Sequence, residues 1–337
     1  MKRTGIVILV VLGIGCSNKS EVDKLNFLKR GNMAYSDGNA SEALRYYNEA
    51  LKIDSAFVDA WNNRGLAEMQ QNLFDEAIFS FEKAIRYKPD YTEALLNSVK
   101  ANIKVHQHYA ALSSLENLQQ LWGDSSIIFF TRGLIYHDMK KNELAMENLK
   151  LAWDKDSTNI ETLINIANVH YHNKEYATAV RLLQQALIKD ADNPMAYNIL
   201  GMAYAETGKL EEALTTIELA SSFNKRDPYI SNNRGYILIK LDSLNAAEEE
   251  LIRSMKLDPY NPWVYRNLGL LRVAQENYSE AERMLARAYE MDPLIENISY
   301  DYIDVLLQTN NYDQACAIAK SDSINIGRYI ALKEYCK

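Results

Sequence analysis

Small and large apolar residues recur along this chain with a period of 34 residues. In most periods a glycine or alanine stands twelve residues before a second small residue, as Gly65 stands before Ala77. Large apolar side chains stand four residues before and sixteen residues after the first small residue, for example Trp61 and Phe81. The second small residue is an alanine in all nine periods: Ala43, Ala77, Ala111, Ala145, Ala179, Ala213, Ala247, Ala281 and Ala315. Because two helices approach closely only where side chains are small, each period predicts one pair of packed helices.

Residues that favour turns separate the predicted helices. Glycine and asparagine occur in the segments 36–39 and 207–209 inside periods, and Pro89 and Pro259 mark connections between periods. These residue types end helices and begin turns. No alternation typical of strands competes with this pattern, so the sequence predicts an all-α solenoid in which each period is one helix-turn-helix.

One period matches a known repeat at six positions: Tyr197, Leu200, Gly201, Tyr204, Ala213 and Ala220. In this pattern the chain resembles the tetratricopeptide repeat (TPR) family, whose unit is also 34 residues long. The resemblance implies a right-handed superhelical solenoid of nine units over residues 24–323. It also implies that the chain binds other proteins.

The third and ninth units depart from the pattern, because Val99 and Ile303 replace the first small residue. Bulk at a close-packing position pushes helices apart, so we expect an altered angle between units near residues 92–125. We expect the ninth unit to be a capping unit. Residues 324–337 follow it as an amphipathic segment, which predicts a C-terminal capping helix over the apolar end of the stack.

The amino terminus carries a separate pattern. Lys2 and Arg3 precede an apolar run over residues 6–12, and a small residue stands directly before Cys16. This arrangement resembles a bacterial lipoprotein signal peptide, and the apolar run is too short to be a permanent membrane span. The resemblance implies that residues 1–15 are removed and that acyl chains are attached to Cys16.

The lipoprotein resemblance also implies a location. Residues 16–23 would form a tether between the lipid and the solenoid, and Ser17 in place of aspartate favours the outer membrane, with the protein facing the periplasm. Leu12 lies four residues before the cysteine, where the family usually has its leucine one residue later. An ordinary cleaved signal peptide and a weak signal anchor therefore remain alternatives.

The charge of the chain argues against a nucleic-acid partner. The full chain has a formal net charge of −8, and from residue 16 onward 35 basic residues face 45 acidic ones. A protein that grips phosphates needs clustered positive potential.

The sequence shows no catalytic constellation, and we expect no enzyme, no cofactor and no metal. None of the five histidines forms the pair four residues apart, with an interposed glutamate, that zinc hydrolases carry on a helix. His106 and His108 fall in a turn of the third unit, where we expect solvated side chains, and we expect His170 to be a packing residue. A metal-dependent enzyme would retain tightly bound zinc through purification.

Asparagine recurs two residues before the first small residue in five units, at Asn63, Asn97, Asn165, Asn233 and Asn267. In the family that the chain resembles, this position faces the inner surface of the superhelix. An amide side chain donates to C=O and accepts from N–H, which suits a peptide main chain. The resemblance thus implies a groove that holds an extended peptide. Asparagine is also common at this place in such repeats, so a purely structural role is the alternative.

Five further residues of the seventh and eighth units are expected to face inward: Tyr229, Asn232, Tyr236, Trp263 and Arg266. Aromatic rings beside an arginine are typical of protein-binding hot spots. The alternative is that Tyr229 and Trp263 pack against the neighbouring units.

Two functions fit these features. One is a membrane-anchored scaffold or adaptor that binds protein or peptide on its concave face in the bacterial cell envelope. The other is a periplasmic chaperone that holds extended segments on the asparagine-lined groove. An adaptor binds one partner at a defined stoichiometry, whereas a chaperone binds many unfolded chains.

Cys316 and Cys336 lie in the ninth unit and in the predicted capping helix. An exported compartment permits a disulfide between them, which would tie the cap to the stack. Two partly buried thiols are the simpler interpretation, since the sequence does not show how close the two residues lie.

Overall fold

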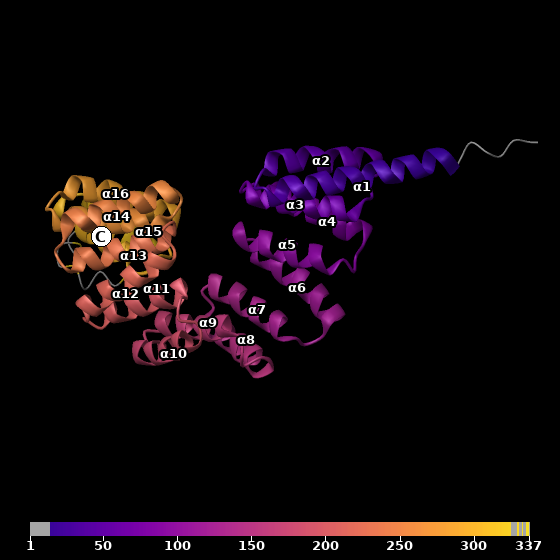
Figure 1. The fold of residues 1–337 in the computed structure, drawn as a ribbon. Coiled ribbons are helices and arrows are strands. Elements are labelled where there is room, and N and C mark those ends of the chain that lie inside the picture. Colours follow the sequence, from indigo (N-terminus) through magenta and orange to yellow (C-terminus); the bar gives the residue numbers. More distant parts are fainter. Residues whose placement is uncertain (1–13, 325–328, 330–331, 333–334, 337) are drawn as a thin grey trace, which may run out of the picture. The chain divides into compact units, whose positions relative to one another are not determined.

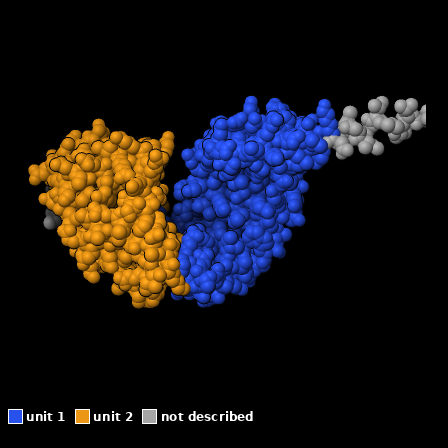
Figure 2. All heavy atoms as spheres, in the orientation of Figure 1, with its two compact units in different colours: residues 1–162 blue, residues 163–337 orange. Residues whose placement is uncertain are grey.

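The computed structural model describes residues 14–324, 329, 332, 335 and 336, with side chains from residue 19 onward. The predicted signal peptide, except for residues 14 and 15, lies outside the described residues, and so does the side chain of Cys16. The described part is all helical, with eighteen α-helices and no strand. The chain forms two compact units, unit 1 over residues 1–162 and unit 2 over residues 163–337 (Figure 2).

Unit 1 contains four helical hairpins that follow one another along the chain (Figure 1). Its helices are α1 (Ile14–Ser36), α2 (Ala40–Ile53), α3 (Val58–Gln70), α4 (Phe74–Tyr87), α5 (Thr92–Lys104), α6 (His108–Trp122), α7 (Ser126–Asp138) and α8 (Asn142–Lys155). Residues 16–23, where we expect a tether, belong to the first turns of α1.

Unit 2 contains the remaining five hairpins, and its first helix begins just before the boundary between the units. Its helices are α9 (Ile160–His172), α10 (Tyr176–Lys189), α11 (Pro194–Glu206), α12 (Leu210–Phe223), α13 (Pro228–Lys240), α14 (Leu244–Leu257), α15 (Pro262–Ala274), α16 (Tyr278–Met291), α17 (Ile298–Gln308) and α18 (Tyr312–Ser321). No helix among the described residues of either unit is long and apolar enough to cross a membrane.

The small residues of the 34-residue pattern lie where helices touch. All nine recurring alanines are completely buried. A Cβ atom added to Gly65 would lie 2.5 Å from Cε1 of Phe81, and one added to Gly235 would lie 2.7 Å from Cγ of Leu251. The first helix of these hairpins therefore leaves room for the large residue sixteen positions later. This confirms the predicted register and the all-α fold.

The turn inside each hairpin has the same backbone shape. Its left-handed residue recurs every 34 positions, at Gly38, Asn72, His106, Lys140, Lys174, Gly208, Asp242, Glu276 and Asn310. Three turns between hairpins in unit 2 use proline as the first helical residue, after a capping Asn193, Asp227 or Asn261 whose side chain accepts from backbone N–H groups. These local signals fix where each of these helices begins.

The end of the chain is tied to the ninth hairpin. Cys316 in α18 and Cys336 form a disulfide, with their Cα atoms 5.3 Å apart. The interpretation as two free thiols is therefore wrong, because the chain after α18 turns back onto the last hairpin. Tyr329 and Leu332 are buried in the same core as Ile303. Most of the predicted capping helix lies outside the described residues.

Candidate peptide-binding site

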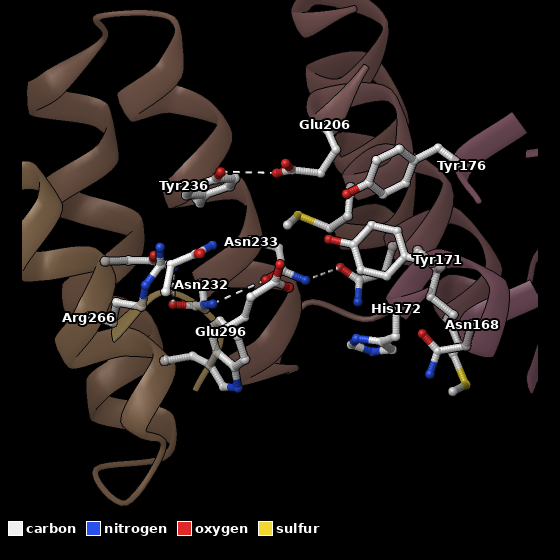
Figure 3. A pocket seen from close by; sticks show the side chains of 17 residues that line it. Asn168, Tyr171, His172, Tyr176, Glu206, Asn232, Asn233, Tyr236, Arg266 and Glu296 are labelled. Atoms are coloured by element: carbon white, nitrogen blue, oxygen red, sulfur yellow. Dashed lines mark hydrogen bonds between the residues drawn. The ribbon is translucent and has the colours of Figure 1, made fainter. Parts of the chain in front are cut away.

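A pocket of about 300 Å³ lies within unit 2 (Figure 3). Its walls come from α9, α11, α13 and α15, together with Tyr176 at the start of α10 and Glu296 and Asn297 just before α17. The α9, α11, α13 and α15 helices are the first helices of successive hairpins, so one position of the repeat pattern contributes side chains to the pocket several times.

Four asparagines along one wall form a continuous relay of hydrogen bonds. Asn267 Nδ2 donates to Asn232 Oδ1 at 2.9 Å. Asn232 Nδ2 donates to Asn233 Oδ1 at 3.1 Å, and Asn233 Nδ2 donates to Asn198 Oδ1 at 3.0 Å (Figure 3). The relay joins α15 to α13 and α13 to α11. Every bond has the same direction, so the amides polarise one another along the chain of bonds.

The two ends of this relay keep hydrogen-bonding capacity. Asn267 is 3% exposed, and its Oδ1 atom is buried without a partner among the described residues. At the other end, Asn198 accepts from Asn233, and its Nδ2 donates to no atom of the part of the chain that the structure describes. A buried acceptor without a donor costs about 1–3 kcal/mol. Because the Asn267 oxygen is shielded from solvent, the relay offers a ligand the Asn198 donor and not the Asn267 acceptor.

Three tyrosines line the pocket near this wall. The rings of Tyr171 and Tyr176 lie 5.6 Å apart between centroids, and Tyr236 Oη donates to Glu206 Oε1 at 3.0 Å (Figure 3). Burial and the nearby Glu206 carboxylate raise the pKa of all three phenols above the ordinary value of 10.0. The three hydroxyls therefore stay neutral at physiological pH and can both donate and accept.

The charged groups of the pocket are paired within the protein. Arg266 donates from Nε and Nη2 to Asp301 Oδ2, each at 2.7 Å, and its guanidinium lies 5.8 Å from the ring centroid of Trp263. Lys174 Nζ lies 2.8 Å from Glu296 Oε1. This second pair links the turn after α9 to the loop before α17, which closes one side of the pocket. A site with both signs of charge already paired does not select a strongly charged ligand.

The structure brings six of the ten predicted binding residues into the pocket: Asn232, Asn233, Tyr236, Trp263, Arg266 and Asn267. Tyr229, at the start of α13, is 52% exposed and does not line it. Asn165 is buried in α9, while Asn63 and Asn97 belong to unit 1.

Sequence reasoning missed the other residues of the pocket. Tyr171, His172 and Glu206 lie in the last turns of α9 and α11, beyond the inward positions that the repeat pattern marks. The aromatic residues Tyr171, His172 and Tyr176 stand close together in the sequence, and this cluster could have indicated the site. Glu296 lies in an irregular loop, and no periodic signal could have indicated it.

Sequence profiles of one protein family match well over half of the chain. Sequence profiles described as "Tetratricopeptide repeat" match residues 58–91, residues 136–200, 170–232 and 272–321, and residues 229–261. A profile described as "TPR repeat" matches residues 31–72.

Curated relatives match at low identity. A "DnaJ homolog subfamily C member 7 homolog" of Schizosaccharomyces pombe is 24% identical over 68% of this chain and 47% of its own length. A "Peroxisomal targeting signal receptor" of Candida albicans is 21% identical over 64% of this chain and 38% of its own length. The chain thus spans less than half the length of these two relatives.

Solved structures show the same fold at 14% identity. The APC/C hetero-tetramer Cut9-Hcn1 matches with a TM-score of 0.62 over 92% of this chain and 75% of its own. A tetratricopeptide repeat protein of Parabacteroides merdae matches with a TM-score of 0.57 over 84% of this chain and 99% of its own. With the buried alanine register and the nine hairpins of the described residues, these matches show that the chain belongs to the tetratricopeptide repeat family, whose fold is a scaffold for protein–protein interaction.

Proposed function

We propose that this chain is a non-enzymatic adaptor that binds an extended segment of a partner protein in the asparagine pocket of unit 2. The observation that carries the proposal is the end of the asparagine relay at Asn198, whose Nδ2 donates to no described atom, in a pocket that also contains the neutral hydroxyls of Tyr171 and Tyr236. The amide donates to a C=O group and a hydroxyl accepts from an N–H group, which matches a peptide main chain. The concave face of the solenoid would present these groups.

The rings around the relay supply contact area for side chains. Tyr171, Tyr236 and Trp263 are rigid aromatic groups with polar atoms, and they lose little conformational entropy on binding. Arg266 is held by Asp301 and so is preorganised beside Trp263. Such a site favours a neutral, partly aromatic or aliphatic segment over a strongly charged one.

We further propose that the adaptor is a lipoprotein of the bacterial cell envelope, anchored through Cys16 and facing the periplasm from the outer membrane. The support is the sequence pattern of the first sixteen residues. A Cys16→Ser variant should leave the membrane fraction and should lose the mass of the acyl chains. Membrane sedimentation together with ordinary signal cleavage in this variant would contradict the anchor.

A periplasmic chaperone is the second candidate function. An amide donor and a hydroxyl acceptor recognise the main chain and no particular side chain, which favours binding of many extended sequences. One of the relatives above, the "Peroxisomal targeting signal receptor" of Candida albicans, is by its name a receptor for a targeting signal. Under this proposal the pocket holds exported chains before they fold.

In-cell photo-crosslinking separates the two functions. A photoreactive residue replaces Tyr236 in the pocket, and the matched control replaces Ile188, which is 83% exposed on α10 and does not line the pocket. One dominant adduct at position 236 supports the adaptor, and a broad set of exported proteins supports the chaperone. No adduct above the control level would refute both functions for this pocket.

A further inference from the structure

Three side chains with metal-binding atoms converge in unit 1. His106 lies in the turn after α5, His108 is the first residue of α6, and Asp138 is the last residue of α7. His106 Nδ1 lies 3.0 Å from Asp138 Oδ2, and His108 Nε2 lies 2.6 Å from the same oxygen. The expectation of a solvated side chain is confirmed for His106, whose side chain is 72% exposed, and is wrong for His108, whose side chain is 18% exposed. The stacking of the third and fourth hairpins brings Asp138 to this turn.

The fold itself holds the three groups in place. His106 occupies the left-handed turn position, with a φ of 56°, that recurs in every hairpin. The third and fourth hairpins contribute the two sides of the cluster, so the convergence does not depend on a long flexible loop. The three ligand atoms all lie within 4.8 Å of one another.

We propose that His106, His108 and Asp138 form a surface site for a divalent transition metal ion, for which Zn²⁺ is the best match. Two imidazoles and one carboxylate are ligands that zinc takes in three-ligand sites, with water in the fourth position. Ligand atoms around a tetrahedral zinc stand about 3.3 Å apart, given bonds of about 2.0–2.1 Å. The separations from Asp138 Oδ2 are shorter than this by less than about 1 Å. Small rotations of the exposed side chains supply the difference.

The exposure of the cluster fits an open site. The side chain of His106 is 72% exposed, that of Asp138 is 35% exposed and that of His108 is 18% exposed. The partly buried His108 provides a fixed ligand, and the open side leaves room for water or for a ligand from another molecule. Bound metal would join the turn of the third hairpin to the end of α7 and would brace the hairpin in which Val99 replaces the usual small residue.

The site belongs to unit 1 and the asparagine pocket to unit 2, so neither proposal depends on the other. We expect the full chain, stripped with a chelator and dialysed, to bind one equivalent of Zn²⁺ in calorimetry and in elemental analysis. Thermal unfolding should shift upward with zinc concentration, because the ion binds the folded state.

Variants locate the binding. His106→Ala and Asp138→Asn should each weaken zinc binding about tenfold or more, since each removes one of three ligands, and circular dichroism should show that both remain folded. His170→Ala is the matched control, because His170 Nδ1 contacts Glu175 Oε2 at 2.7 Å in a pair without a second histidine. This control should bind zinc as the parent chain does. Binding of no zinc, or binding that the two variants leave unchanged, would overturn the proposal.

Discussion

The two units contain similar asparagine relays in different surroundings. In unit 1, Asn97 donates to Asn62 at 2.9 Å, Asn62 donates to Asn63 at 3.1 Å, and Asn63 donates to Asn32 at 2.9 Å. In unit 2, the relay that begins at Asn267 has the same first two steps, but its third step ends at Asn198, whose repeat position in unit 1 is Leu28. The relay is therefore first a structural bond between hairpins, and its presence alone does not make a binding site.

The side chains beside the two relays differ. Leu66 and Leu96 stand in the repeat positions of Tyr236 and Arg266. Asn97 lines a hollow of about 340 Å³ together with Leu66, and the lining of this hollow includes one asparagine and no carboxylate among the described residues. The repeat register thus supplies the amides in both units, whereas residues outside the consensus decide what those amides can bind.

Breaking the disulfide should have the largest effect, and only in unit 2. The bond between Cys316 and Cys336 joins residues 20 positions apart, for which we expect about 3 kcal/mol of stabilisation. Cys336→Ser should lower the unfolding temperature of unit 2 and leave that of unit 1 unchanged in calorimetry. If the unfolding temperatures of both units fall equally, or if neither changes, the disulfide does not stabilise unit 2 specifically.

A larger side chain at a close helix contact should destabilise either unit nearly as much as loss of the disulfide destabilises unit 2. Gly65→Leu and Gly235→Leu each place a side chain against the large residue sixteen positions later, and we expect each to cost about 1–3 kcal/mol or more. Urea unfolding of the two variants measures the loss. Unchanged stability in either variant would contradict the shared register.

Alanine variants at equivalent asparagines of the two relays should distinguish a loss of stability from a loss of binding. Asn97→Ala and Asn267→Ala each leave a buried carbonyl oxygen, on Asn62 or Asn232, without its donor. We expect each to lose about 1–3 kcal/mol of stability in urea unfolding. Only Asn267→Ala should also reduce the crosslinking yield from position 236. Equal losses of yield would mean that the effect on binding follows from stability alone.

The smallest effect concerns the ion pair of Lys24 and Asp54, which joins α1 to the end of α2. Lys24 Nζ lies 2.7 Å from Asp54 Oδ2, and this hydrogen bond holds the pKa of the Asp54 carboxyl below its usual value of 3.8. Because the folded pKa is lower than the unfolded one, the pair stabilises the fold above the unfolded pKa. That contribution disappears as the pH falls through the folded pKa.

The pair is partly exposed, so we expect a contribution of about 0.2–1 kcal/mol. Asp54→Asn should therefore lower the stability of unit 1 slightly near neutral pH and have no effect at a pH below the folded pKa. Urea unfolding of both chains across this pH range measures the difference. An effect that grows as the pH falls would reverse the sign and contradict this assignment.

The hairpins could be predicted because their signals are local and periodic. The recurring alanines and the facing pair Gly65 and Phe81 fix the helix contacts within one hairpin. The relays needed more than the period, since three of their four bonds between hairpins join asparagines 35 residues apart, at positions that differ by one between neighbouring hairpins. A search for asparagines at that separation would have found these three bonds, whereas Asn63 and Asn32 stand 31 residues apart.

The other residues of the asparagine pocket and of the histidine cluster come together only because separate hairpins pack against one another. Glu296 reaches the pocket from a loop in which Asn297 has a φ of 64°, and the repeat pattern contains no signal for this geometry. Asp138 meets His106 and His108 only because the fourth hairpin stacks on the third. Both contacts join residues of different hairpins, whereas sequence patterns describe one hairpin at a time.

The assignment of binding to unit 2 is tested most directly by the same photoreactive residue at position 66 and at position 236, which are equivalent positions beside the two relays. We expect adducts of partner proteins from position 236 and only background from position 66. We also expect that Asn267→Ala reduces the adducts from position 236. Equal capture from both positions, or capture from position 66 alone, would contradict a binding site in unit 2.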